Sequence, residues 1–337
     1  MDMTPPRADE LAAADQRLVD GVLARGQGQR RALAKTITLV ESTRTDHQER
    51  AQQVLTALLP HTGRAIRVGI SGVPGSGKST FVEALGNYLI DTGKRLAVLA
   101  VDPSSSISGG SILGDKTRME SLCLREEAFI RPSPSSGSLG GVAEKTRETM
   151  LVFEAAGYDV IIVETVGVGQ SETTVAGMVD IFVLLQLPNA GDDLQAIKKG
   201  IVEIADLIVF NKADLDERAA EFARIQMKTA LTMLRPASPN WRPPVLSVSA
   251  LAKRGIPEFW AQVERYRETM TASGEFDEKR KRQALNWMWS LIDSGLRQYF
   301  RQHPAVRASL AELSHAVSEG RITPGAAAYR LLGSIKL

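Results

Sequence analysis

The sequence has little of the side-chain chemistry that binds transition metals or forms disulfides. It contains one cysteine, Cys123, and four histidines, and no two of these residues stand at the spacing of a zinc or nickel site. A single cysteine excludes a disulfide within the chain and suits a reducing compartment, so we predict a cytoplasmic protein. Buried packing is the expected role of Cys123, because no histidine nearby would activate it.

Long apolar runs and an excess of charge are also absent. No 18 consecutive apolar residues occur, and residues 1–11 lack the apolar stretch of a signal peptide. The 41 basic and 39 acidic residues nearly balance, so we expect no binding to nucleic acid or membrane. The one charge run, at residues 278–282, is interpreted as a solvated helix turn.

A phosphate-binding motif begins the central region. Residues 72–79 read Gly-Val-Pro-Gly-Ser-Gly-Lys-Ser, between an apolar strand at 66–71 and a helical stretch. The glycines let backbone N–H groups turn toward a phosphate, Lys78 would reach the β- and γ-phosphates, and Ser79 would ligate Mg²⁺. The predicted phosphate-binding residues are Gly72, Gly75, Ser76, Gly77, Lys78, Ser79 and Thr80.

A second motif favours guanine over adenine. A predicted strand at 206–210 leads into Asn211-Lys212-Ala213-Asp214, and Asp214 would accept hydrogen bonds from the N1–H and the amine of guanine. Adenine offers neither donor, and an unpaired acceptor costs about 1–3 kcal/mol. A third strand, at 244–248, ends in Ser249, Ala250 and Leu251, whose backbone could contact the guanine carbonyl. GTP and GDP are therefore the expected ligands.

Acidic residues follow two further predicted strands. The strand at 158–163 ends at Glu164, which could hold a Mg²⁺-bound water, and the N–H of Gly167 could bind a γ-phosphate oxygen. The strand at 95–101 ends at Asp102, which could assist the metal. Asp115, in the Ser- and Gly-rich loop that follows, could swing toward Mg²⁺. Helix capping is the alternative role for all three acids. The predicted catalytic residues are Lys78, Asp102, Glu164 and Gly167, and the predicted metal ligands are Ser79, Asp102 and Glu164.

One residue that many small GTPases use is missing. They place a water-orienting glutamine directly after the glycine that senses the γ-phosphate. Here Val168 stands at that position, and the nearest glutamine is Gln170. We therefore predict slow hydrolysis by the isolated chain, stimulated by a partner, with Gln170 or Lys198 as candidates for the missing role.

The alternation of apolar runs and helical stretches predicts an α/β fold with a mostly parallel sheet, flanked by helices on both faces. We expect three parts: an N-terminal helical extension at 1–63, a P-loop nucleotide domain at 64–272, and a C-terminal helical arm at 273–337. All the phosphate sensors fall at the carboxyl ends of predicted strands, where open α/β sheets bind ligands.

The C-terminal arm carries a broad apolar stripe at helical spacing. Such a stripe packs either on its own domain or on a second subunit, and its tryptophans favour the second subunit. The residues of the stripe are Leu285, Met288, Trp289, Ile292, Leu296 and Phe300, widened by Trp287.

Several strings together resemble the MeaB/ArgK-type GTPases of the SIMIBI class of P-loop proteins. They are Glu164 to Glu172, the run 101–106, the run 109–115, and Gly191-Asp192-Asp193-Leu194-Gln195, and the resemblance covers roughly residues 10–335. It implies a G-protein chaperone of adenosylcobalamin-dependent methylmalonyl-CoA mutase, which couples its GTP state to cofactor loading and to protection of the mutase.

The resemblance also implies partners and residue roles. It implies a homodimer through the C-terminal arm, contact with the adenosyltransferase, and a client-responsive loop at 188–200 with Asp192 and Lys198 as signalling residues. The phosphate, metal and guanine roles carry over to Lys78, Ser79, Asp102, Glu164 and Asp214. No motif for cobalamin itself is present, so direct binding of that cofactor is not expected.

Three other functions stay open. The chain could serve another metalloenzyme or cobalamin enzyme as a GTPase chaperone. It could also be an ATPase or kinase linked to basic amino-acid transport, although Asp214 argues against ATP. A nucleotide-stabilised scaffold without turnover is the third alternative, and Lys78, Ser79 and Glu164 argue against it.

Overall fold

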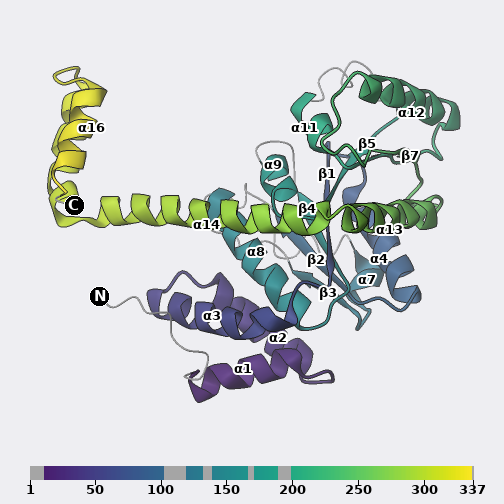
Figure 1. The fold of residues 1–337 in the computed structure, drawn as a ribbon, viewed down its shortest axis with the longest axis horizontal. Helices are drawn as coiled ribbons and strands as arrows, with labels where there is room; N and C mark the ends of the chain where they lie inside the picture. Colours follow the sequence, from purple (N-terminus) through teal and green to yellow (C-terminus); the bar gives the residue numbers. More distant parts are fainter. Residues whose placement is uncertain (1–10, 102–118, 132–138, 166–170, 189–198, 336–337) are drawn as a thin grey trace. The chain divides into compact units, whose positions relative to one another are not determined.

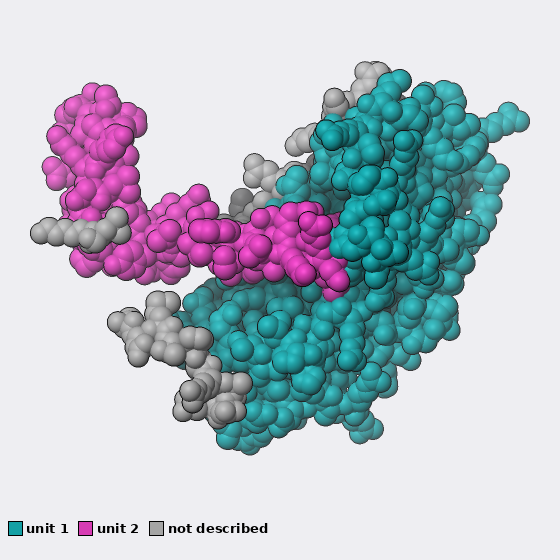
Figure 2. Space-filling model, viewed as in Figure 1, with its two compact units in different colours: residues 1–276 teal, residues 277–337 magenta. Residues whose placement is uncertain are grey.

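The computed structural model describes residues 11–101, 119–131, 139–165, 171–188 and 199–335. The predicted Asp102, Asp115, Gly167, Gln170, Asp192 and Lys198 lie outside these ranges. The chain divides into two compact units, residues 1–276 and 277–337 (Figure 2). Each unit is described by itself below.

A parallel sheet organises the first unit (Figure 1). Its order is β3-β2-β4-β1-β5-β6-β7, so the strand that leads into the phosphate-binding motif is central. The register places Val68 of β1 between Ile162 of β4 and Ile181 of β5. The strands are β1 (Ile66–Gly72), β2 (Leu96–Val101), β3 (Ala128–Arg131), β4 (Val160–Thr165), β5 (Ile181–Gln186), β6 (Leu207–Phe210) and β7 (Val245–Ser247).

The predicted α/β fold with a parallel sheet is confirmed. Most predicted strand boundaries agree with the structure within two residues. The largest shift is at β4, where Tyr158 and Asp159 precede the strand because the N–H groups of Asp159 and Val160 both bond to the carbonyl of Arg95. Glu164 therefore lies within β4 and not after it.

Helices cover both faces of the sheet, as continuous apolar strands require. On one face α1, α2, α3 and α8 pack with the sheet into one core, and on the other face α4 and α13 pack into a second core. The helices of this unit are α1 (Ala13–Leu23), α2 (Gln29–Glu41), α3 (Thr45–Leu58), α4 (Lys78–Asp91), α7 (Glu120–Cys123), α8 (Leu139–Ala155), α9 (Ser171–Ala176), α11 (Lys199–Ile204), α12 (Glu217–Thr232) and α13 (Ile256–Ala272), with a short 3₁₀ turn at Leu59–His61.

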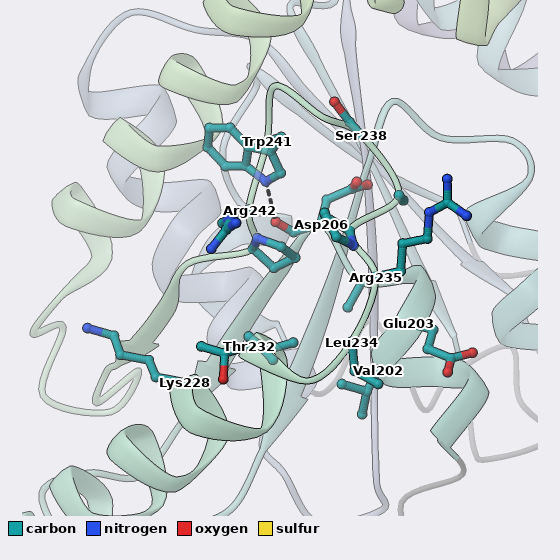
Figure 3. Close-up of a pocket in the computed structure, with 15 residues that line it drawn as sticks. Val202, Glu203, Asp206, Lys228, Thr232, Leu234, Arg235, Ser238, Trp241 and Arg242 are labelled. Atoms are coloured by element: carbon teal, nitrogen blue, oxygen red, sulfur yellow. Dashed lines mark hydrogen bonds between the residues drawn. The ribbon is translucent and has the colours of Figure 1, made fainter.

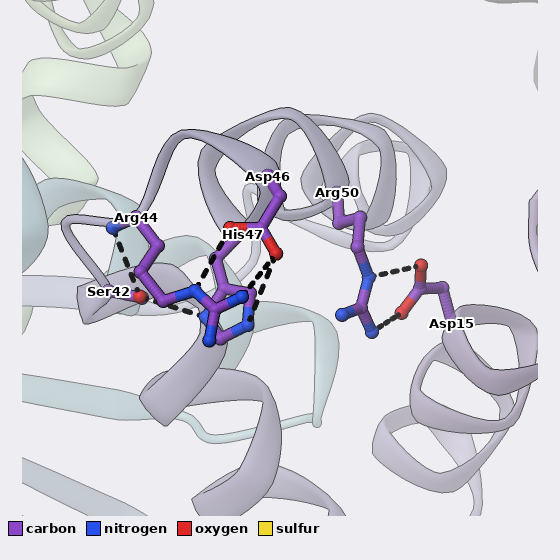
Figure 4. Close-up of polar contacts among 6 residues, drawn as sticks. All are labelled: Asp15, Ser42, Arg44, Asp46, His47 and Arg50. Carbon is purple, nitrogen blue, oxygen red and sulfur yellow. Dashed lines mark hydrogen bonds and ion pairs between the residues drawn. The ribbon is translucent and has the colours of Figure 1, made fainter.

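The N-terminal helices are held together by a charge pair as well as by apolar contacts. Asp15 on α1 is fully buried, and both its oxygens accept from Arg50 on α3, at 3.0 and 2.7 Å (Figure 4). The neighbouring pair of Arg44 and Asp46 is exposed, with side-chain exposures of 69% and 58%. Burial makes the first pair structurally necessary, because removing Arg50 would leave a buried carboxylate unpaired.

The second unit is helical. It contains most of α14 (Glu275–Gln302), together with α15 (Pro304–Ser318) and α16 (Pro324–Gly333). Pro304 and Pro324 each start a helix, where a missing N–H costs nothing. Few of its apolar side chains are buried within the described residues, and Val306 and Ala327 are the main examples.

Candidate nucleotide site

The phosphate-binding motif joins the centre of the sheet to α4. β1 ends at Gly72, and α4 begins at Lys78, whose Nζ donates to the carbonyls of Gly72 and Val73 at 2.8 and 3.3 Å. Gly77 has a φ of +82°, and a Cβ there would lie 2.7 Å from Nδ2 of Asn211. Glycine is therefore required at position 77 by both conformation and space.

The side chain of Asn211 joins the phosphate-binding motif to the loop after β7. Its Nδ2 donates to the carbonyl of Ser76 at 2.8 Å, and its Oδ1 accepts from the N–H of Ala250 at 3.1 Å. One buried amide thus fixes the spacing between the phosphate-binding motif and the loop after β7. The sequence analysis placed Asn211 in the guanine motif but did not foresee this link, because only the fold brings residues 76, 211 and 250 together.

The predicted guanine acceptor lies at the edge of the same cluster. The N–H of Ala213 donates to the carbonyl of Val248 at 3.0 Å, which joins the loop after β6 to the end of β7. A hydrogen bond from Ser249 is the main cause that lowers the pKa of the Asp214 carboxyl below its ordinary value. Asp214 is fully exposed to solvent, so its ionised carboxylate is available to donors of a ligand.

Two predicted metal ligands, one on α4 and one on β4, are in contact. The hydroxyl of Ser79, in the first turn of α4, donates to Oε1 of Glu164 at 3.2 Å. Glu164 is 5% exposed and lies near the end of β4. A hydroxyl and a carboxylate are oxygen ligands of the kind that Mg²⁺ prefers, so this pair fits the ion. β2 ends one residue before Asp102 and pairs with β4 through Val101 and Thr165.

The phosphate loop also holds an unsatisfied hydroxyl. Ser76 is fully buried, and its Oγ has no hydrogen-bond partner in the part of the chain that the structure describes. Its backbone carbonyl, by contrast, is bound by Asn211. The backbone of Ser76 is therefore fixed at the phosphate loop, and the predicted contact of this residue with a phosphate stays a prediction.

Further metal or membrane features are not seen in the described ranges. They contain no group of three or more His, Cys, Asp or Glu side chains that could hold a metal ion. They also contain no helix that is long and apolar enough to span a membrane.

A cavity lies at the amino ends of the strands, away from the phosphate-binding motif. This cavity of about 160 Å³ adjoins Asp206, just before β6, and Trp241, whose Nε1 donates to the Asp206 carbonyl at 2.8 Å (Figure 3). Lys228 and Arg235 also line it, but Figure 3 shows their side chains directed to different sides. Because its charges do not converge, the cavity offers no defined anion site.

Comparisons with known proteins agree with this geometry. A family model described as "Methylmalonyl Co-A mutase-associated GTPase MeaB" matches residues 33–305. The GTPase ArgK of Escherichia coli is 53% identical over 80% of this chain and 82% of its own length. The mitochondrial methylmalonic aciduria type A homolog of Mus musculus is 47% identical over 97% of this chain and 81% of its own.

A solved structure shares the whole fold. The crystal structure of a LAO/AO transport system kinase is 39% identical, covers 98% of this chain and 99% of its own, and superposes with a TM-score of 0.74. The family match spans well over half of the chain, and Asn211 is bonded to the phosphate-binding motif. The chain therefore belongs to the MeaB family of P-loop GTPases, binds GTP and GDP, and hydrolyses GTP.

Proposed function

We propose that this GTPase is a chaperone of adenosylcobalamin-dependent methylmalonyl-CoA mutase, and that its GTP state controls cofactor loading and protection of the mutase. The observation that carries the proposal is the family match over residues 33–305, together with a nucleotide site built around Asn211. The similarity to the mouse methylmalonic aciduria type A homolog supports the same client.

The first role assigned to the site is to neutralise the negative charge of the bound phosphates. Lys78 neutralises the β- and γ-phosphates, and its present bonds to the carbonyls of Gly72 and Val73 hold its amine over the loop. Ser79 and Glu164, with Asp102 as an additional ligand, would hold Mg²⁺, which would supply further positive charge against the phosphates. The Gly167 N–H contacts the γ-phosphate only before hydrolysis, so it reports the nucleotide state.

Base selection rests on Asp214. Its lowered pKa keeps the carboxylate ionised at neutral pH, where it accepts from the N1–H and amine of guanine. Lys212, two residues before Asp214, adopts a left-handed backbone conformation with a φ of +61°. The remaining base contacts are assigned to Ser249, Ala250 and Leu251. Leu251 is 80% exposed, so its side chain is free to cover a bound base.

Assembly is assigned to the second unit. The apolar stripe of α14 includes Leu285, Trp289 and Leu296, which are 57%, 60% and 61% exposed in the single chain. Each large apolar side chain that becomes buried contributes about 1.5–3 kcal/mol, so covering several of them is strongly favourable. A second copy of the chain is the proposed cover, which gives a homodimer through residues 273–337.

The experiment that tests the proposal is GTP turnover with and without purified methylmalonyl-CoA mutase. We expect slow turnover by the chaperone alone, because Val168 stands where other GTPases have a catalytic glutamine, and clear acceleration by the mutase. Lys78→Ala should lower both rates about a hundredfold to a thousandfold. If the mutase neither binds nor accelerates turnover, the client assignment is wrong and the GTPase activity still stands.

The LAO/AO transport system kinase favours one alternative for the same fold, namely transfer of phosphate to a protein that serves transport. This alternative predicts that ATP competes effectively with GTP and that labelled phosphate stays on an acceptor. Competition by ATP is measured directly with a fluorescent GTP analogue. Displacement by ATP at equal concentration would favour the kinase, whereas displacement by GTP alone would exclude it.

A further inference from the structure

A large cleft lies at the amino ends of the strands, on the opposite sheet edge from the nucleotide site. It has a volume of about 960 Å³ and opens between the turn joining α1 to α2 and the loop joining α7 to β3. Residues just before β2 and β4 form its floor. Four arginines from four different segments line it, namely Arg25, Arg30, Arg95 and Arg125.

Two of these guanidinium groups, those of Arg25 and Arg95, converge. A Cβ placed on Gly157 would lie 3.4 Å from Nη2 of Arg25 and 3.7 Å from Nη1 of Arg95, so both groups approach the same point. Arg95 also lies over the ring of the adjacent Tyr158, 4.4 Å from its centroid. Arg30, on α2, lines the same cleft.

No carboxylate neutralises this cluster. Within the described ranges Arg25, Arg30 and Arg95 make no ion pair, whereas Arg125 pairs with Asp91 and Glu127. The other acids nearby are Glu126, on the wall of the cleft, and Asp159, which accepts from the backbone N–H of Arg95 at 2.7 Å. Like charges that share one cleft without ion-pair partners repel one another, and an anion bound among them would relieve the repulsion.

Two of the three arginines are held in place before any ligand arrives. Arg95 donates to the carbonyl of Ala156 and to Oε1 of Gln29, both at 2.8 Å, and Gln29 is itself buried. Arg30 donates to the carbonyl of Ala128 at 2.8 Å and lies 5.1 Å from the ring centroid of Phe129. Fixed donors lose little entropy on binding, so the cluster is organised in advance.

Joining α2 to the sheet does not account for the charge. A neutral amide could donate to the same carbonyls, as Gln29 does to Val22 and Ala156 at 2.7 and 3.0 Å. Arg25, moreover, makes no hydrogen bond or ion pair within the described part of the chain. The hydrogen bonds therefore do not require the positive charges, which contact only the rings of Phe129 and Tyr158 within the described residues.

We propose that this cleft binds a small phosphate-bearing molecule through Arg25, Arg30 and Arg95, separately from the nucleotide site. Guanidinium groups bind phosphate oxygens through paired N–H donors. Two such groups at one point, with a third lining the same cleft, match a compact, multiply charged oxyanion. Carboxylates spread along an acidic peptide would match a dispersed row of cations instead. The volume of the cleft leaves room for a molecule larger than phosphate itself.

Calorimetric titration with tripolyphosphate tests the proposal. The protein is first saturated with GDP, so that the phosphate loop is occupied, and the buffer is kept at low ionic strength because salt screens such contacts. We expect saturable binding that Arg25→Gln weakens at least about tenfold, since a hydrogen bond to a charged group contributes about 1.5–3 kcal/mol. Lys78→Ala should leave this binding unchanged.

A matched variant separates the cleft from general surface charge. Arg31 is an exposed arginine on α2 that lines a different groove, so Arg31→Gln should bind tripolyphosphate like the original protein. Arg95→Gln should also weaken binding, but Arg25→Gln decides the matter because it removes no described hydrogen bond. The proposal is overturned if the GDP-saturated protein shows no saturable binding, if Arg25→Gln and Arg31→Gln behave alike, or if a hexaglutamate peptide binds as tightly as tripolyphosphate.

Discussion

The two compact units treat their large apolar side chains in opposite ways. In the first unit the sheet strands are almost wholly buried between two layers of helices, and Phe81, Phe153 and Phe182 are 1% exposed or less. In the second unit the apolar stripe of α14 is mostly solvent-exposed in the single chain. The first unit therefore contains its own core, whereas α14 has apolar surface that its own unit does not bury.

The comparison shows what an amphipathic pattern does and does not determine. Apolar spacing predicts that a helix buries one face, but it does not specify the surface that covers that face. For α2 the cover is the rest of the first unit, where Leu33, Ile37 and Val40 are completely buried. For α14 we assign the covering surface to a second copy of the chain. Mutations should then be able to remove GTP turnover without dimerisation, and dimerisation without GTP turnover.

The largest expected effect is loss of chemistry without loss of assembly. Lys78→Ala removes the amine that neutralises the γ-phosphate, so we expect GTP turnover to fall about a hundredfold to a thousandfold. The oligomeric state should not change, because Lys78 lies in the first unit. Turnover assays and analytical ultracentrifugation on the same sample measure both. A variant that lost its assembly together with its activity would contradict the separation of the two units.

The converse change should remove assembly without removing chemistry. The double variant Trp289→Ser/Leu296→Ser deletes two exposed apolar side chains, so we expect the dimer dissociation constant to rise about a hundredfold or more. GTP turnover per chain, measured without the mutase, should stay within about twofold. Gln298→Ser, at an exposed polar position of the same helix, is the matched control. If the original protein is monomeric at all concentrations, the assignment of α14 to a dimer is wrong.

The sequence predicts most strongly where one local pattern determines one structure. The five strands predicted at 66–71, 95–101, 158–163, 206–210 and 244–248 correspond to β1, β2, β4, β6 and β7, because burial on both faces leaves a continuous apolar signal. The phosphate loop was predicted from residues 72–79 alone, because its glycines, Lys78 and Ser79 are consecutive or nearly so. The pairing of Ser79 with Glu164 needed the strand order as well, and the structure supplies it through the β1–β4 register.

Contacts between distant polar residues could not be predicted in this way. Asp15 and Arg50 are 35 positions apart, and neither stands in a motif, yet the buried carboxylate of Asp15 pairs with the Arg50 guanidinium, whose side chain is 41% exposed. The arginines of the cleft are equally scattered, at positions 25, 30 and 95. Periodicity reports which faces are apolar, and it contains no information on which polar groups the fold brings together.

A smaller effect, on stability, tests how firmly the N-terminal helices belong to the first unit. Arg50→Ala leaves Asp15 buried without its partner, and we expect a loss of about 2–4 kcal/mol in the free energy of unfolding. Arg44→Ala removes the exposed pair with Asp46 and should cost less than about 0.5 kcal/mol. Urea denaturation of the two variants measures the difference. Equal losses would mean that burial of Asp15 does not control the strength of its pair.

The smallest expected effect is the response of base selection to pH. The hydrogen bond from Ser249 is the main cause that lowers the folded-state pKa of Asp214 below the ordinary aspartate value of about 4. The carboxylate is therefore ionised throughout the range above about pH 4, and it is protonated only at lower pH. The preference for GTP over ATP should therefore be constant from about pH 8 to about pH 5. We expect the same flat profile for Trp289→Ser/Leu296→Ser, because base selection is set entirely within the first unit. Competition binding across this range measures it, and a preference that declines before pH 5 would mean that Asp214 is not the ionised acceptor. A profile that changed only in the stripe variant would instead show that the second unit reaches the nucleotide site, and the contrast between a self-contained first unit and an assembling second one would fail.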